Sequence, residues 1–134
     1  MRTILVVDDD PWVRVLTRDM LAGEGFRVLE ASDGQDAIRV ASDHPGPIHL
    51  LLTDVVMPGM NGCELAAGLS ALLPGMQVMF MSAYDRDFLV AHGLDLIGPV
   101  ITKPFTLAYL SRRVQMVLGR RAPAAPSPAP ARGR

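Results

Sequence analysis

The chain has 134 residues, of which 49% are hydrophobic and 20% are charged. This length and composition predict one domain with a buried core and exclude a protein that is disordered throughout. The single cysteine, Cys63, excludes an internal disulfide, and no apolar stretch reaches the roughly 18 residues of a membrane span. The first apolar run, Ile4–Val7, is too short for a signal peptide, so we expect a cytoplasmic protein without a membrane partner.

The net charge of −1 is unevenly distributed. Residues 120–134 hold four arginines and no acidic residue, so residues 1–119 carry a net charge of −5. Residues 120–134 also hold four prolines among alanines, a composition that cannot bury enough surface to fold. We therefore expect a folded domain over residues 1–119 and a disordered Ala/Pro/Arg-rich tail over residues 120–134. The acidic domain argues against sequence-specific binding of nucleic acid.

The first segments predict a strand and then a helix. Ile4–Val7 is short and rich in β-branched residues, as buried strands are. Asp10 can cap a helix that has Pro11 at its first position, and Gly23 and Gly25 mark the end of that helix. Three apolar side chains repeat along it at helical spacing: Val13, Leu16 and Met20.

The middle of the chain continues this alternation. Phe26–Ala31 predicts a second strand. A helix is expected to follow it and to end at the Pro-Gly-Pro sequence of residues 45–47. The apolar positions of that helix are Ala37, Ile38 and Ala41. Ile48–Thr53 is apolar almost throughout and predicts a third strand, which leads into the Pro- and Gly-rich loop Asp54–Gly62.

The last part of the folded region predicts two more strands and three helices. A stripe of leucines indicates the first of these helices: Leu65, Leu69, Leu72 and Leu73. After a Pro-Gly pair, Gln77–Ser82 predicts the fourth strand and residues 85–92 a short helix. Val100–Thr102 predicts the fifth strand and Thr106–Leu118 the last helix.

Five strands that alternate with five helices predict an α/β fold, in which helices cover both faces of a five-stranded parallel sheet. Sites in such sheets form beyond the carboxyl ends of the strands. Polar side chains stand at or just after four of these ends: Asp8 and Asp9, Asp54, Ser82, and Lys103. We expect these five side chains to point into one crevice.

This group of side chains favours phosphoryl chemistry assisted by a metal ion. Three carboxylates repel one another, by on the order of 4 kcal/mol for each pair ~4 Å apart at an effective dielectric of ~20. A divalent cation and the Lys103 ammonium together would balance them, and oxygen ligands suit Mg²⁺ better than zinc. Asp54 is the candidate nucleophile toward phosphorus, and the Ser82 hydroxyl can donate to a phosphoryl oxygen. Gly59 and Gly62 allow the backbone to approach this site closely.

Four segments, ILVVDDDP, LLTDVVMPGMNG, VMFMSA and ITKPF, closely resemble receiver domains of two-component response regulators over residues 2–118. The resemblance implies a flavodoxin-like strand order, 2-1-3-4-5. It also implies transfer of a phosphoryl group from a phosphohistidine of a sensor histidine kinase or a histidine phosphotransfer protein. Signalling would then proceed through contacts with a downstream protein, with a phosphorylation-dependent homodimer as one form. Such a domain catalyses only its own phosphorylation and dephosphorylation and is no metabolic enzyme.

The same resemblance assigns a role to each site residue. It implies that Asp54 is the phospho-acceptor and that Ser82 and Lys103 are the hydroxyl and the amine that assist it. It implies a Mg²⁺ site with three protein ligands and one acid that acts through water: Asp9, Asp54, the backbone carbonyl of Val56, and Asp8 through water. The Lys103-Pro104 peptide bond is expected to be cis.

One position departs from the family pattern. Receivers usually carry Phe or Tyr three residues before the lysine, where it couples the hydroxyl to the output face, but this chain has Val100. We therefore expect the phosphoryl chemistry without the usual aromatic switch, and Tyr84 or Tyr109 as a substitute for it. Tyr84 is also expected to restrict the attacking water and to lengthen the lifetime of the phosphoryl group.

Other functions remain open at this point. The chain is a single-domain receiver, a receiver module detached from a hybrid histidine kinase, or a pseudo-receiver that binds partners without phosphorylation. A phosphatase or mutase of the haloacid dehalogenase type needs a hydroxyl residue four positions after Asp8, where this chain has Trp12. A flavin site is disfavoured because the acidic loop after the first strand would repel the cofactor phosphate.

Overall fold

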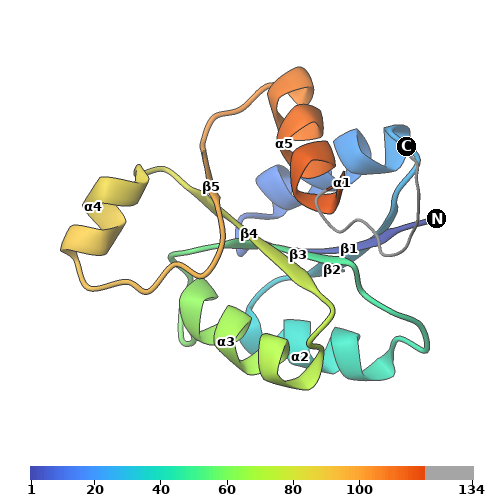
Figure 1. Cartoon of the computed structure of the whole chain (residues 1–134), viewed down its shortest axis with the longest axis horizontal. Coiled ribbons are helices and arrows are strands. Elements are labelled where there is room, and N and C mark those ends of the chain that lie inside the picture. The colour runs from blue at the N-terminus through green and yellow to red at the C-terminus, as the bar shows by residue number, and fades with distance from the viewer. Residues whose placement is uncertain (120–134) are drawn as a thin grey trace, which may run out of the picture.

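The computed structural model describes residues 1–119, which form five strands alternating with five helices (Figure 1). The elements in chain order are β1 (Thr3–Val7), α1 (Pro11–Gly23), β2 (Arg27–Ala31), α2 (Gly34–Asp43), β3 (Leu50–Asp54), α3 (Gly62–Leu72), β4 (Gln77–Ser82), α4 (Arg86–Ala91), β5 (Val100–Thr102) and α5 (Leu107–Gly119). The predicted α/β fold class is confirmed, and the five strands begin and end within two residues of their predicted bounds. The tail expected over residues 120–134 lies outside the described residues.

The five strands form one parallel sheet in the order β2-β1-β3-β4-β5, as the resemblance implied. Figure 1 shows α1 and α5 on one face of this sheet and α2 and α3 on the other, while α4 lies at one end of the molecule. None of the helices in the described part of the chain is long and apolar enough to span a bilayer. With the strands parallel, all their carboxyl ends lie on one edge, where the site forms.

The core is divided by the sheet because neighbouring strand residues face opposite sides. Leu5 and Val7 of β1 pack in the cluster under α2 and α3, whereas Ile4 and Val6 pack in the cluster under α1 and α5. Strands β1, β3 and β4 contribute side chains to both clusters, which explains why these three strands are apolar almost throughout. Each fully buried side chain of this size contributes about 1.5–3 kcal/mol.

Polar side chains start the helices that follow the first three strands. Asp10 accepts hydrogen bonds from the backbone N–H groups of Trp12 and Val13 at 3.0 and 3.4 Å, which confirms it as the cap of α1. Asn61 and Glu64 form a reciprocal capping box at α3, which was not among the predicted caps. These caps fix the loops that leave β1 and β3, and both loops carry candidate site residues.

Two apolar positions in the helical stripes are not buried. Leu72 is 70% exposed because it is the last residue of α3, beyond the sheet surface that covers Leu65 and Leu69. Leu16 is 54% exposed, and Leu21 instead fills the core beneath α1. Helical spacing alone does not show which leucines of a stripe are buried.

Candidate functional site

The three predicted acids meet at the carboxyl edge of the sheet. Carboxylate oxygens of Asp8, Asp9 and Asp54 all lie within 4.8 Å of one another. Their convergence follows from the register of the central strands, because Val7 of β1 pairs with Thr53 of β3 and the next residues are Asp8 and Asp54. The expected cluster of acids is therefore present in the structure.

Lys103 joins this cluster from the end of β5. Its Nζ lies 2.8 Å from Asp8 Oδ2 and 3.4 Å from Asp54 Oδ2. Its backbone N–H donates to the carbonyl oxygen of Ser82 at 2.7 Å, which anchors the start of the loop to β4. The peptide bond between Lys103 and Pro104 is cis, as expected. One ammonium against three carboxylates leaves the cluster with a charge of −2, which a divalent cation balances.

Asp8 is held by the fold itself. Its side chain is fully buried, its Oδ1 accepts the Asp10 N–H at 2.9 Å, and its Oδ2 accepts from Lys103. Both oxygens are thus already occupied by donors of the protein, as buried carboxylates require. This arrangement suits an acid that shapes the site more than one that contacts a metal directly.

Asp9 and Asp54 have free capacity for a ligand. Asp9 is exposed, and its carboxylate makes no hydrogen bond or ion pair among residues 1–119. The Asp54 side chain is 13% exposed and contacts only the Lys103 amine through its carboxylate in that part of the chain. Hard carboxylate oxygens on a partly open rim fit Mg²⁺, which keeps several waters and needs few protein ligands. The donor set therefore fits the expected cation.

Burial and neighbouring charges shift the pKa values of Asp54 and Lys103. Burial raises the pKa of Asp54 from its ordinary 3.8 to about 6, with Lys103 opposing this shift and Asp8 and Asp9 adding to it. Burial lowers the pKa of Lys103, but the contacts with Asp8 and Asp54 outweigh it and leave that pKa raised. The amine therefore stays charged at neutral pH, while the Asp54 carboxylate is costly to ionise without a cation.

A test of this electrostatic cost is the pH dependence of stability without metal. The folded chain holds the Asp54 proton to higher pH than the unfolded chain, so the free energy of unfolding should fall as the pH rises from about 4 to about 6. Asp54→Asn should remove this loss and raise the free energy of unfolding above pH 6.5 by about 1–2 kcal/mol, a value reduced for partial exposure. Urea denaturation in EDTA measures it. Asp43→Asn, at an exposed site, is the matched control, and equal stabilities of the two variants would contradict the assignment.

Ser82 and Val56 are less closely tied to the cluster. Ser82 is buried at the end of β4, and its Oγ accepts the Tyr84 N–H at 2.9 Å. No hydrogen bond joins this hydroxyl to Asp54 within residues 1–119. Val56 lies in the loop after β3 with an exposed side chain. The roles expected for Ser82 and for the Val56 carbonyl remain predictions.

The glycines noted in the loop after β3 are needed for its path. A Cβ on Gly62 would lie 2.1 Å from the carbonyl oxygen of Asp54, so α3 begins in direct contact with the backbone of that residue. Gly59 has a φ of +74°, a conformation that favours glycine. A close approach to the backbone of Asp54 is thus present at Gly62, whereas nothing lies within 4 Å of a Cβ built on Gly59.

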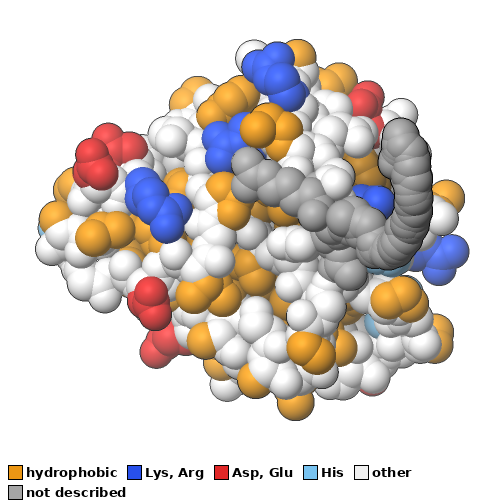
Figure 2. Space-filling view, viewed as in Figure 1, with side chains coloured by type: hydrophobic (Ala, Val, Ile, Leu, Met, Phe, Trp, Pro, Cys, Tyr) orange, Lys and Arg blue, Asp and Glu red, His pale blue; other side chains and the backbone are white. Residues whose placement is uncertain are grey.

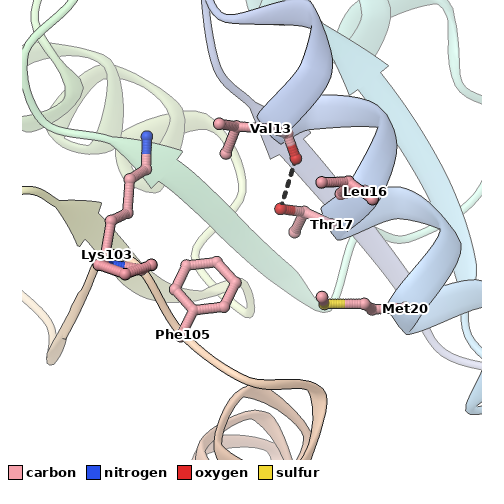
Figure 3. A pocket seen from close by; sticks show the side chains of 7 residues that line it. Val13, Leu16, Thr17, Met20, Lys103 and Phe105 are labelled. Atoms are coloured by element: carbon pink, nitrogen blue, oxygen red, sulfur yellow. Dashed lines mark hydrogen bonds between the residues drawn. The ribbon is translucent and has the colours of Figure 1, made fainter.

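An apolar pocket of about 170 Å³ lies beside the acid cluster, between α1 and the loop that leads into α5. Figure 3 shows the Phe105 ring facing α1 across this pocket, with Val13 and Leu16 on the helix side. The Thr17 hydroxyl that borders it donates to the Val13 carbonyl at 2.7 Å, so the lining is apolar. The exposed Leu16 thus belongs to a surface hollow instead of the core.

Arg14 also lies at the site, although its sequence position did not predict this. This residue of α1 donates from Nη1 to the carbonyl oxygen of Asp8 at 2.9 Å. Its place one turn after the cap of a helix that follows the acidic loop was a weak signal, because the partner of a long side chain depends on the tertiary structure.

Comparison with known proteins agrees with the fold. The family model described as response regulator receiver domain matches residues 4–115. The chain is 32% identical over 127 residues to the alkaline phosphatase synthesis transcriptional regulatory protein PhoP of Bacillus subtilis, covering 94% of this chain and 52% of that protein. It is 31% identical over 117 residues to the sensor kinase CckA of Brucella abortus, covering 87% of this chain and 12% of that protein.

Two solved structures show the same relation. The receiver domain from the hybrid histidine kinase CckA has a TM-score of 0.73 and 34% identity, covering 87% of this chain and 98% of that one. The response regulator TrrA from Thermotoga maritima, in complex with Mg(2+)-BeF, has a TM-score of 0.72 and 28% identity, covering 87% and 99%. The chain spans about half the length of PhoP and of several other curated relatives. It belongs to the response regulator receiver domain family of two-component systems.

Proposed function

We propose that this chain takes a phosphoryl group from a phosphohistidine onto Asp54, with Mg²⁺ bound, in a two-component phosphorelay. The observation that carries the proposal is the cluster of three carboxylates with the Lys103 amine between two of them. In the transfer, an Asp54 oxygen forms a bond to phosphorus while the bond from phosphorus to the imidazole nitrogen breaks. That nitrogen takes up a proton, and the donor returns to neutral histidine.

The side chains around Asp54 would share the charge of the transferred group. Asp9, Asp54 and the Val56 carbonyl would hold Mg²⁺, with Asp8 acting through water, and the cation would supply positive charge to the phosphoryl oxygens. The Lys103 amine, 3.4 Å from Asp54 Oδ2, would stabilise the same oxygens. While its Oγ accepts the Tyr84 N–H, the Ser82 hydroxyl still has its own hydrogen to donate.

The output would proceed through protein contacts at α4, β5 and α5. Val100 occupies the position where receivers usually carry the aromatic switch residue. Tyr84, one of the expected substitutes, stacks on Phe88 of α4 with the two ring centroids 4.4 Å apart. Figure 2 shows acidic side chains together with a basic one over α4, and basic side chains over α5. Acidic side chains at α4 of one copy would attract basic side chains at α5 of another across a two-fold axis, and a phosphorylation-dependent homodimer is part of the proposal on this ground.

The wider setting of the domain is also part of the proposal. The donor would be a sensor histidine kinase or a histidine phosphotransfer protein, and the target a downstream protein, in the cytoplasm. The similarity to the receiver of the hybrid kinase CckA favours the variant in which this receiver serves a hybrid kinase. Its only chemistry would be its own phosphorylation and dephosphorylation.

The test is phosphorylation by acetyl phosphate, a small donor that needs no partner protein. Intact-mass spectra of the wild-type chain should show an adduct of about 80 Da, the mass that a phosphoryl group adds, when Mg²⁺ is present and none when EDTA replaces it. An absence of the adduct in Mg²⁺ would contradict the proposal and favour the pseudo-receiver. Turnover of a phosphomonoester with phosphate on Asp8 would favour the phosphatase reading instead.

A further inference from the structure

Arg14 links helix α1 to the loop that carries the acids. Its Nη1 donates to the carbonyl oxygen of Asp8 at 2.9 Å, and its Nε lies 3.3 Å from Glu30 Oε1 on β2. The Arg14 side chain is only 19% exposed. Because the guanidinium is planar and is held at two points, it fixes the direction of the Asp8 carbonyl.

The Asp8 carbonyl belongs to the peptide unit that joins Asp8 to Asp9. A peptide unit is planar, so a bond that fixes its oxygen also fixes its N–H and the start of the next residue. The Asp8 carboxylate is already held by the Asp10 N–H and by Lys103. The Asp9 carboxylate makes no hydrogen bond of its own among the described residues. The bond from Arg14 is therefore one restraint on where Asp9 points, beside the bond from the Asp10 N–H to Asp8 Oδ1 that spans Asp9.

The positive charge of Arg14 is partly offset by a neighbouring carboxylate. Glu30 faces the guanidinium with its Oε1 and accepts from Arg18 with its Oε2 at 2.9 Å. The carboxylate thus offsets part of the positive charge that Arg14 brings toward the site. Arg14 can hold the acidic loop while the cluster of acids keeps its negative charge.

We propose that Arg14 is a positioning residue for the Asp9 carboxylate and thereby sets the affinity of the site for Mg²⁺. This proposal rests on the proposed function, which makes Asp9 a metal ligand. A ligand held in place before binding loses less freedom when the metal arrives. Loss of groups that orient metal ligands typically weakens binding 10–100-fold, and Arg14 acts through a backbone carbonyl, so we expect about tenfold.

The experiment compares Arg14→Met with Arg18→Met. Methionine keeps the apolar stem of arginine but has no donor. Arg18 is the matched control because it lies one turn further along α1 and also bonds Glu30, but does not contact the Asp8 carbonyl. Mg²⁺ is titrated into each folded chain and followed by calorimetry and by the fluorescence of Trp12, which is 78% exposed beside the acidic loop.

We expect the Kd for Mg²⁺ to rise about tenfold in Arg14→Met and to stay within about twofold of wild type in Arg18→Met. Equal changes in the two variants, or none in Arg14→Met, would overturn the role of Arg14 while leaving the proposed function intact. A wild-type chain that binds no Mg²⁺ would overturn both. If Arg14→Met does not fold, Arg14→Lys and Arg18→Lys are compared instead. A single ammonium nitrogen in place of the planar fork should weaken Mg²⁺ binding about threefold at position 14 only.

Discussion

Replacement of Asp54 by asparagine is expected to reduce phosphoryl incorporation from acetyl phosphate by at least about 100-fold. The amide is the same size as the carboxylate but lacks the anionic oxygen that attacks phosphorus. The neighbouring acids do not offer a substitute, because Asp8 is fully buried with both oxygens bonded and the Asp9 carboxylate would hold Mg²⁺. Intact-mass spectra with Mg²⁺, followed by peptide mapping, measure the remaining adduct.

The matched control for this loss is Asp43→Asn, on the surface of α2. Asp43 is an aspartate of the same size with an exposed side chain, so its variant should incorporate phosphoryl groups as the wild type does. Both variants should remain folded. In Asp54→Asn, Lys103 keeps its bond to Asp8, and in Asp43→Asn the changed side chain is exposed. Incorporation in Asp54→Asn near the wild-type extent, or an adduct mapped to another acid, would contradict the assignment of Asp54.

Substitution of alanine for Gly62 is expected to lower the free energy of unfolding by about 3 kcal/mol. The added Cβ would stand 2.1 Å from the Asp54 carbonyl oxygen and 3.0 Å from the Val55 Cα, both backbone atoms that cannot rotate away. Either α3 or the end of β3 must move, and the Gly62 N–H would lose its 2.8 Å bond to the Val55 carbonyl oxygen. The affinity for Mg²⁺ should fall as well, because the Asp54 backbone lies in the path of that shift.

Gly68→Ala provides the control on the same helix. Gly68 lies inside α3 with nothing within 4 Å of an added Cβ, so alanine should stabilise the chain there by roughly 0.5–1 kcal/mol. Urea denaturation of the two variants should therefore give shifts of opposite sign. Equal midpoints would show that the contact between Gly62 and Asp54 does not constrain the start of α3.

The fold could be predicted because its signals are local. Short apolar runs separated by helical stripes and Gly or Pro breaks define each element, and the rule that parallel strands share a carboxyl edge brings Asp8, Asp9, Asp54 and Lys103 together. The confirmed register of β1 against β3 is the physical reason that this rule works here. The strand order itself came from the resemblance, since composition and periodicity do not order the strands of a sheet.

The features that the sequence did not predict depend on how neighbouring helices and strands pack and where they end. Helical spacing identifies the face on which Leu16 and Leu72 lie, but not that α1 overhangs a surface hollow or that α3 ends at Leu72. Arg14 escaped notice because a long side chain can reach several partners, and its choice of the Asp8 carbonyl follows from the packing of α1 on β2. The Ser82 hydroxyl was expected to face Asp54, and its bond to the Tyr84 N–H could not be derived from spacing.

The division of the core by the sheet has a consequence for how this domain tolerates change. Leu51 and Leu52 are neighbours in the chain, yet they belong to separate apolar compartments. Substitutions at such positions disturb different sets of packing partners. The changes that they cause in the free energy of unfolding should therefore be closer to additive than is usual for residues adjacent in the chain. A substitution in the compartment under α1 and α5 should therefore leave the packing of the compartment under α2 and α3 largely unchanged.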